Sequence, residues 1–190
     1  MKIALIGGSS FIGQILINHL LKRKIYVTAT YHNAFEVKKK IKKVKWKKLD
    51  FSKKKNYFKY LNFPDVVINL SWPDIPHYHK KEHLKTYKLQ KEFNYNLIKN
   101  GLKNLIISGT CYEYGKVQGN VSENKSAKPV VTYAVAKLKL LKSILRLQKS
   151  HNFNLAWLRP FFVYGKNKKR KTLFTLIRDS KKINKVLSVN

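Results

Sequence analysis

The strongest constraint on the fold is a regular alternation of short apolar runs with longer segments of helical spacing. Apolar residues recur at helical spacing in 11–22, 82–100 and 131–150, and residues 52–62 indicate a weaker helix. The apolar runs between them are predicted to be strands, over residues 2–6, 25–31, 44–50, 65–71, 104–110 and 153–160. Strands that are apolar on both faces and alternate with helices are typical of parallel sheets covered on both sides. The sequence therefore predicts an α/β fold with a doubly wound parallel sheet.

The formal net charge of +32 raises the question of a polyanionic partner, because such a charge is common in proteins that bind nucleic acid or anionic membranes. However, the 41 basic residues are nearly all lysine and are spread along the chain. A nucleic-acid reader usually carries arginine and aromatic residues on one basic face. The favoured interpretation is lysine used as a solvated surface residue, with no specific nucleic-acid partner. A basic module that binds polyanions remains the alternative.

The cellular environment is indicated by cysteine usage and by hydrophobic segment length. Cys111 is the only cysteine, so an internal disulfide is impossible, as is common in a reducing compartment. The apolar run after Lys2 is too short for a secretion signal and has no cleavage pattern. No stretch approaches the ~20 apolar residues of a membrane span. We therefore expect a cytoplasmic protein without a membrane partner.

The first motif is GGSSFIG at residues 7–13, which joins a predicted strand to a predicted helix. The first turn of a helix leaves N–H groups without partners and carries partial positive charge, so it attracts anions. Gly7 can adopt a backbone conformation closed to other residues, and Gly13 lets the helix lie close to the strand. Ser9 and Ser10 can add hydroxyl donors to a phosphate. A dinucleotide site and a plain glycine turn are both consistent with this stretch alone.

The second motif is Tyr133-Ala-Val-Ala-Lys137, at the start of a predicted helix. A spacing of four residues places both side chains on one helix face. A nearby ammonium favours the phenolate and lowers the pKa of a tyrosine from ~10, so the phenol could exchange a proton with a carbonyl oxygen. Chance is the alternative, because tyrosine and lysine are abundant. The pair follows the fifth predicted strand, which would bring it to the carboxyl edge of the sheet, where ligands bind.

Taken together, the chain resembles the extended short-chain dehydrogenase/reductases that act on nucleotide sugars, which have a Rossmann-type doubly wound sheet. The likeness is strongest to reductases of 4-keto-6-deoxy nucleotide sugars, of the CDP-abequose synthase type. Six motifs occur in the family's order: GGSSFIG (7–13), LDFS (49–52), VVINLSW (66–72), IISGTCYEYG (106–115), YAVAK (133–137) and WLRPFFVYG (157–165).

The resemblance implies roles for individual residues. Tyr133 would be the catalytic acid, Lys137 would hold ribose hydroxyls and tune Tyr133, and Thr110 would hydrogen-bond the sugar carbonyl. The cofactor-binding residues would include Asp50 for the adenine amino group and Pro160 and Val163 for the nicotinamide. The remaining cofactor-binding positions would be Gly7, Ser9, Ser10, Phe11, Ile12, Gly13, Phe51, Leu70, Ser71, Trp72 and Lys137.

No metal is predicted. His79, Glu82 and His83 match an inverted zinc-protease pattern on paper. They follow the fourth predicted strand, where the fold expects a cofactor rim. A polar, solvated start of a helix is therefore the favoured interpretation.

The chain departs from the family pattern in informative places. Sugar 4,6-dehydratases carry an Asp-Glu pair after the threonine, whereas this chain has Cys111 and Tyr112, so dehydration is not expected. Other family positions also differ, namely Ser10, Gln90 and Phe162.

The choice of cofactor depends on charge at the end of the second predicted strand. NAD readers usually place a carboxylate there, and this chain has none until Glu36. His32 and Lys38 would accommodate a 2′-phosphate instead. We therefore expect NADP(H) as the preferred cofactor, with NAD(H) possible.

The resemblance also implies a domain organisation. Residues 1–165 would form the NAD(P)-binding domain, and 166–190 would begin a substrate-binding lobe that is largely absent, so the chain is expected to be truncated. A homodimer would form through helices 82–100 and 131–150. The expected activity is reduction of a 4-keto group of a nucleotide-linked deoxysugar. An NAD-dependent nucleotide-sugar epimerase and an inactive truncated nucleotide-binding domain are the alternatives.

Overall fold

The computed structural model describes residues 1–32, 43–164, 177 and 180. The chain divides into two compact units, Met1–Pro160 and Phe161–Asn190. All helices and strands named below belong to the first unit. Glu36, Lys38 and most of the predicted substrate-lobe segment 166–190 lie outside the described residues.

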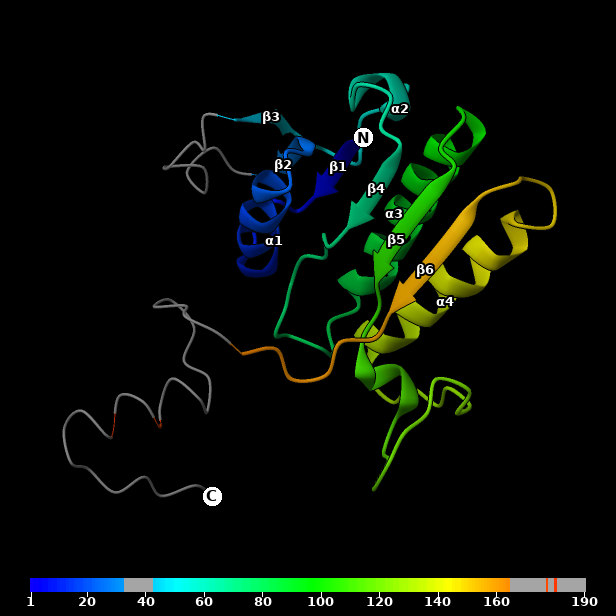
Figure 1. The fold of residues 1–190 in the computed structure, drawn as a ribbon. Coiled ribbons are helices and arrows are strands. Elements are labelled where there is room, and N and C mark those ends of the chain that lie inside the picture. Colours follow the sequence, from blue (N-terminus) through cyan, green and yellow to red (C-terminus); the bar gives the residue numbers. More distant parts are fainter. Residues whose placement is uncertain (33–42, 165–176, 178–179, 181–190) are drawn as a thin grey trace. The chain divides into compact units, whose positions relative to one another are not determined.

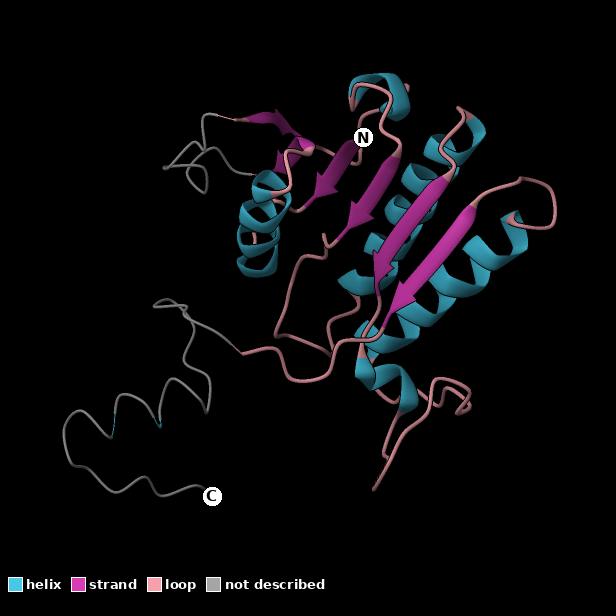
Figure 2. Cartoon of the chain, viewed as in Figure 1, coloured by secondary structure: helices cyan, strands magenta, loops and turns pink. Residues whose placement is uncertain are grey.

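The first unit is built on a parallel sheet with the strand order β3-β2-β1-β4-β5-β6. The arrows of β1, β4, β5 and β6 point the same way in Figure 2, and β2 and β3 pair in parallel with their neighbours, so the carboxyl ends of the strands share one edge. The strand order reverses between β1 and β4, which is the usual ligand-binding point of such sheets. This confirms the predicted doubly wound fold. The strands are β1 (Lys2–Ile6), β2 (Tyr26–Tyr31), β3 (Val44–Lys48), β4 (Val66–Asn69), β5 (Asn104–Ser108) and β6 (Asn154–Leu158).

Helices follow most of the strands, as the apolar spacing predicts (Figure 1). The predicted helix over 52–62 is wrong at its start, because the Asp50 carboxylate accepts hydrogen bonds from Ser52 and holds a turn there. Only four helical residues follow, after Asn56 caps the N–H of Lys59. The helices are α1 (Phe11–Lys22), α2 (Tyr57–Tyr60), α3 (Glu82–Lys99), α4 (Thr132–Leu147) and the 3₁₀ helix η2 (Cys111–Tyr114).

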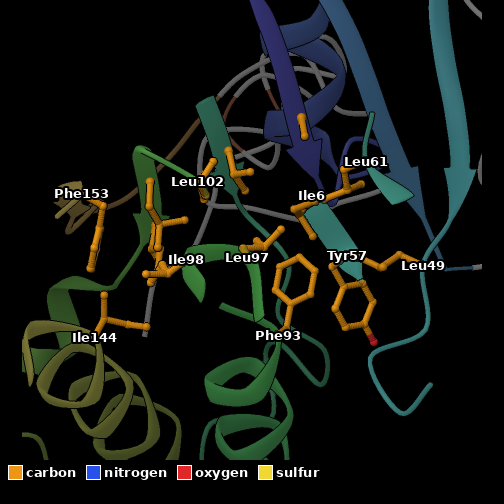
Figure 3. Close-up of a cluster of buried hydrophobic side chains, with 14 of the residues drawn as sticks. Ile6, Leu49, Tyr57, Leu61, Phe93, Leu97, Ile98, Leu102, Ile144 and Phe153 are labelled. Carbon is orange, nitrogen blue, oxygen red and sulfur yellow. The ribbon is translucent and has the colours of Figure 1, made fainter. Parts of the chain in front are cut away.

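Both faces of the sheet are covered, which explains why the strands are apolar throughout. Along β1, Ala4 and Ile6 belong to a cluster with α3 and α4, whereas Ile3 and Leu5 belong to a second cluster with α1. Figure 3 shows the first cluster, where the buried ring of Phe93 lies beside the ring of Tyr57, with 4.8 Å between their centres, and close to Ile6 of β1. Each fully buried large apolar side chain contributes about 1.5–3 kcal/mol, so these two layers stabilise the sheet whose carboxyl edge carries the site.

Within the described ranges, no helix combines the length and the apolar character needed to cross a lipid bilayer.

Candidate cofactor and active site

The turn between β1 and α1 is shaped by close backbone contacts. Gly7 has φ +80°, in the left-handed region that favours glycine, and its N–H donates to Thr30 Oγ1 at 3.0 Å. A Cβ on Gly13 would lie 2.5 Å from the carbonyl oxygen of Gly7, so only glycine fits there. Ser10 caps α1, because its Oγ accepts from the N–H of Gly13 at 3.1 Å. The result is a helix N-terminus at the carboxyl edge of β1, an arrangement suited to an anion.

A cavity of about 430 Å³ opens beside this turn. Its walls come from the segments that follow β1, β2, β3 and β4, so it lies at the point where the strand order reverses. Eight of the predicted cofactor-binding residues line it: Gly7, Ser9, Ser10, Asp50, Phe51, Leu70, Ser71 and Trp72. Further lining residues include Thr30, His32, Leu49, Ser52, Pro73, Thr86 and Leu89.

Asp50 contributes a carboxylate to the rim of the cavity. Its Oδ1 accepts from the N–H and the hydroxyl of Ser52 at 2.9 and 2.7 Å. These hydrogen bonds hold the pKa of Asp50 below its usual value. The side chain therefore presents an ionised acceptor, as expected for a group that reads an amino group.

The wall after β4 is fixed by a buried amide network. The amide of Asn69 donates to Gln90 Oε1 at 2.8 Å, and the Gln90 amide donates to the backbone oxygen of Ser71 at 3.1 Å. Asn69 Oδ1 in turn accepts from the N–H of Ser71 at 3.1 Å. Gln90, one of the departures from the family pattern, thus ties α3 to the cavity wall.

Tyr133 and Lys137 lie one turn apart on the buried face of α4. Tyr133 is 6% exposed and Lys137 is 2% exposed. Lys137 Nζ donates to the backbone oxygen of Ser108 at 2.5 Å and lies 5.9 Å from the centre of the Tyr133 ring. The same nitrogen lies 4.1 Å from the centre of the Trp72 ring, which borders the cavity. Trp72 therefore links the cavity to the Tyr-Lys pair.

The ring of Tyr133 is surrounded by aromatic rings of the segment after β4 and of the first turn of α3. Trp72, Tyr78 and His83 place their ring centres 5.9, 5.7 and 5.3 Å from that of Tyr133. The side chain of Thr110 hydrogen-bonds the Tyr133 hydroxyl. The predicted catalytic residues Thr110, Tyr133 and Lys137 are thus brought together at the carboxyl edge of β5.

The pKa of Tyr133 differs from the expectation based on the sequence. Burial raises the pKa of Tyr133 above its ordinary value, and the Thr110 hydrogen bond only partly opposes this effect. Burial lowers the pKa of Lys137 to about 7, against the opposing charge of Glu113. The sequence suggested that the ammonium lowers the pKa of Tyr133. In the chain itself, desolvation dominates both groups.

Glu113 was not among the site residues predicted from the sequence. Its carboxylate is fully buried, accepts from the N–H of Thr110 at 2.9 Å, and pairs with Arg159 Nε at 2.8 Å. The available signal was the spacing Thr110-x-x-Glu113, which is a capping box. The partner Arg159 follows β6 and could not be found from spacing.

The remaining predicted residues lie around these groups. Phe11, Ile12 and Gly13 form the first turn of α1 and are not among the cavity-lining residues. Pro160 lies at the end of the first unit, where its backbone oxygen accepts from the N–H of Cys111 at 3.2 Å. Val163 belongs to the second unit, so its contact with the nicotinamide stays a prediction.

The histidine pattern at residues 79–83 is explained by local hydrogen bonds. His83 is buried, with Nδ1 3.1 Å from Trp72 Nε1 and Nε2 2.9 Å from the backbone oxygen of His77. Both ring nitrogens are therefore engaged in fixing the segment before α3. No cluster of metal-ligating side chains occurs among the residues that the structure describes.

The doubly wound sheet, the glycine turn and the cavity at the switch point define a nucleotide-binding domain of the Rossmann class. Comparison with known proteins makes this assignment specific. The model of the NAD dependent epimerase/dehydratase family matches residues 3–189, and the chain belongs to this family.

Individual relatives are more distant. The chain is 25% identical over 114 residues to dTDP-6-deoxy-L-talose 4-dehydrogenase (NAD(+)) of Aggregatibacter actinomycetemcomitans, an alignment that covers 60% of this chain and 42% of that protein. It shares its fold with UDP-glucuronic acid 4-epimerase from Bacillus cereus in complex with NAD, with a TM-score of 0.81 and 23% identity. That match covers 100% of this chain and 66% of the epimerase.

A further solved relative is UDP-N-acetylglucosamine 4-epimerase from Methanobrevibacter ruminantium M1, with a TM-score of 0.78 and 17% identity. The match covers 94% of this chain and 63% of that protein. The chain therefore spans less than two thirds of the length of these relatives.

Proposed function

We propose that this chain is the cofactor-binding part of an NAD(P)-dependent enzyme that reduces a 4-keto group of a nucleotide-linked deoxysugar. The observation that carries the proposal is the juxtaposition of Tyr133, Lys137 and Thr110 beside the cavity at the β1–β4 switch point. A phenol, a buried amine and a hydroxyl in this arrangement suit proton transfer to a carbonyl oxygen.

A dinucleotide fits the residues that are present. The glycine turn and the N-terminus of α1 suit a diphosphate, and the charged Asp50 suits an adenine amino group. The cavity volume of about 430 Å³ lies in the range of small-molecule sites. A bound nicotinamide would supply the hydride that the phenol itself cannot supply.

The chain's own residues account for the proton. The raised pKa of Tyr133 keeps the phenol protonated at neutral pH, so it can donate to a developing alkoxide. Thr110 already hydrogen-bonds this hydroxyl and could hold the same carbonyl oxygen. Lys137, with a pKa of about 7, would gain charge when a ligand offers hydroxyl oxygens to it. The aromatic residues around Tyr133 would exclude water.

The test is Tyr133→Phe in the full chain, assayed with a 4-keto-6-deoxy nucleotide sugar by the loss of NADH or NADPH absorbance. Loss of the proton donor should lower kcat by about 10²–10⁴-fold while cofactor binding is kept. Tyr26→Phe is the matched control, because Tyr26 is 77% exposed and begins β2, at the opposite edge of the sheet. Turnover by the wild-type chain that survives in Tyr133→Phe would refute the assignment.

An epimerase is the second candidate, because two fold relatives are 4-epimerases and one of them is in complex with NAD. The same Tyr-Lys pair could serve a cycle in which hydride leaves and returns. Such an enzyme would interconvert sugar epimers without net change in NADH and would retain cofactor during purification. A chain that binds cofactor but converts no sugar would support the inactive nucleotide-binding domain.

For the cofactor, the family description favours NAD(H) over the NADP(H) preference that the sequence suggested. The exposed His32 lines the cavity and could face a 2′-phosphate, so the preference for NADP(H) stays a prediction. Parallel fluorescence titrations with NADH and NADPH decide between them. Tighter binding of NADPH, weakened in His32→Ala, would favour the sequence-based preference.

Assembly and location are also proposals. Helices α3 and α4 pack together and leave Tyr95 and Leu145 exposed, so they could form the dimer contact that the resemblance implies. Light scattering with size-exclusion chromatography would measure the mass in solution. Nucleotide-binding residues 1–165 and a substrate segment 166–190 remain the proposed domains, in a cytoplasmic protein.

A further inference from the structure

The buried carboxylate of Glu113 contacts more of the site's framework than its capping motif requires. Of the two reciprocal bonds in a capping box, the Glu113 side chain supplies only one, by accepting from the N–H of Thr110. Glu113 also accepts from Trp157 Nε1 at 3.2 and 3.1 Å and from Arg159 Nε at 2.8 Å. One carboxylate therefore joins η2 to the end of β6.

From these contacts, we propose that Glu113 is a positioning residue that holds the Thr110 hydroxyl against Tyr133. The inference rests on the proposed function, since it assigns Thr110 and Tyr133 to proton transfer. It adds a residue that touches neither substrate nor cofactor.

The packing around Glu113 shows how tightly this position is defined. A Cβ on Gly109 would lie 2.5 Å from Glu113 Oε1 and 2.2 Å from Trp157 Nε1, so the backbone before Thr110 is pressed against the carboxylate. Backbone bonds join the same two segments, from Gly109 N to Leu158 O at 2.6 Å and from Cys111 N to Pro160 O. Thr110 thus has little freedom to move while Glu113 is in place.

Arg159 extends the network to the loop after η2. Its Nη1 lies 3.2 Å from the hydroxyl of Tyr114 and 3.4 Å from the backbone oxygen of Glu123. A buried carboxylate without a partner would be strongly unfavourable, and Arg159 supplies the ion-pair partner of Glu113.

The charge of Glu113 reaches the proposed proton-transfer groups. From α4, Tyr133 and Lys137 face it, and the pKa of each is raised by its negative charge. From η2, Cys111 also faces it, and the negative charge of Glu113 raises the pKa of this thiol as well. From the end of β6, Arg159 is the facing cation. Removing the charge should therefore lower the pKa of Tyr133, Lys137 and Cys111 together.

The test compares Glu113→Gln with Glu123→Gln in the full chain. Both substitutions remove one negative charge, but Glu123 is exposed and only its backbone oxygen contacts Arg159. We expect kcat of Glu113→Gln to fall about 10²-fold, because small misplacements of a reacting group have effects of this size, with KM and cofactor affinity nearly unchanged. Its alkaline limb in the pH profile of kcat should move to lower pH. Glu123→Gln should match the wild type.

A merely structural role would lower thermal stability and kcat without moving the pH profile, and that result would overturn the proposal. Glu113→Asp separates the two effects if Glu113→Gln folds poorly. It keeps the charge but shortens the side chain, so its pH profile should return toward the wild type while kcat stays low.

A second readout does not need turnover. Cys111 is the only cysteine and directly follows Thr110, so its alkylation by iodoacetamide reports the packing of η2. Glu113→Gln should label faster than the wild type below the unfolding temperature, even at a pH where the thiolate fractions are matched. Faster labelling without any wild-type turnover would refute the proposed function but keep the packing role. Unchanged labelling and an unchanged pH profile would refute the role of Glu113.

Discussion

The two halves of the site are built from different kinds of groups. One half uses backbone groups at the β1–α1 turn, and the other uses buried ionisable side chains at the end of β5. At the β1–α1 turn, the predicted ligand contacts come from backbone geometry, with Gly7, Ser10 and Gly13 chosen for what they permit. At the end of β5, the same sheet edge carries buried ionisable side chains. Lys137 is 2% exposed and Glu113 is fully buried.

This difference determines how each half responds to mutation and to pH. A turn built on close contacts is sensitive to added volume and insensitive to titration, because none of its groups ionises near neutrality. A cluster built on buried charge is sensitive to pH, since burial shifts each pKa. Variants in each half of the site test this difference.

Gly13→Val should have the largest effect. Even a Cβ would lie 2.5 Å from the oxygen of Gly7 and 2.8 Å from the Cα of Gly8, and backbone atoms cannot move aside as a side chain can. We expect a loss of about 3 kcal/mol in the free energy of unfolding, measured by urea denaturation, and loss of NADH binding.

The matched control is Ile15→Val, two residues further along α1 at a 43% exposed position. It introduces the same side chain into the same helix, so it should change stability by less than about 0.5 kcal/mol. If Gly13→Val were as stable as Ile15→Val, the close contact would not constrain the turn. The loss in Gly13→Val should also be the same at pH 7 and pH 8.5.

Lys137→Met tests the other half through the pH dependence of stability. The folded pKa of about 7 lies below the ordinary value of 10.5, so between these values the unfolded chain binds more protons than the folded chain. The contribution of Lys137 to stability therefore rises with pH above about 7, by up to about 1.4 kcal/mol per pH unit. Tyr133 affects the pH dependence of stability only above about pH 10, its ordinary pKa, because its pKa in the folded chain is raised.

The measurement is the difference in unfolding free energy between Lys137→Met and the wild type. Methionine has no charge to desolvate, so the unfolding free energy of the variant should rise relative to that of the wild type as pH falls. Between pH 8.5 and pH 7 the difference should change by about 1.6 kcal/mol in favour of the variant. Lys139→Met, on the same helix, serves as the control for a lost lysine. A difference that stays constant over this range would show that Lys137 is not desolvated.

Features that depend on the local sequence pattern could be predicted from the sequence. The parallel sheet covered on both faces follows from apolar runs alternating with helices, because such strands need cover on both sides. The close approach at Gly13 was likewise expected from local residues alone. Eight predicted cofactor residues line the cavity because they occupy consecutive positions after strands that end at one edge.

Features that depend on burial and on distant partners were not predictable. The sequence places Lys137 four residues after Tyr133. It does not show that Trp72 lies against the Lys137 ammonium and His83 against the Tyr133 ring, in a buried setting where desolvation is the dominant effect. The ion pair of Glu113 with Arg159 joins residues 46 positions apart, so no local pattern contains it. Similarly, the turn held by Asp50 displaced the start of the predicted helix over 52–62.

Ser10→Ala should have the smallest effect. It tests whether the Ser10 side chain serves the stability of the turn, the binding of NADH, or both. Ser10 Oγ caps α1 by accepting from the N–H of Gly13, and loss of a serine cap costs about 1 kcal/mol. The variant should therefore lose about 1 kcal/mol of unfolding free energy and bind NADH more weakly. Circular dichroism in urea and fluorescence titration measure the two quantities.

Ser10→Asn distinguishes the cap from the hydroxyl. Asparagine caps helices about as well as serine, so the unfolding free energy should return to within a few tenths of a kcal/mol of the wild type. If NADH binding returns with it, the cap alone positions the turn, and backbone groups are sufficient for binding at the β1–α1 turn. Binding that stays weak while stability recovers would mean that Ser10 donates directly to the ligand, so side-chain chemistry would matter in both halves of the site.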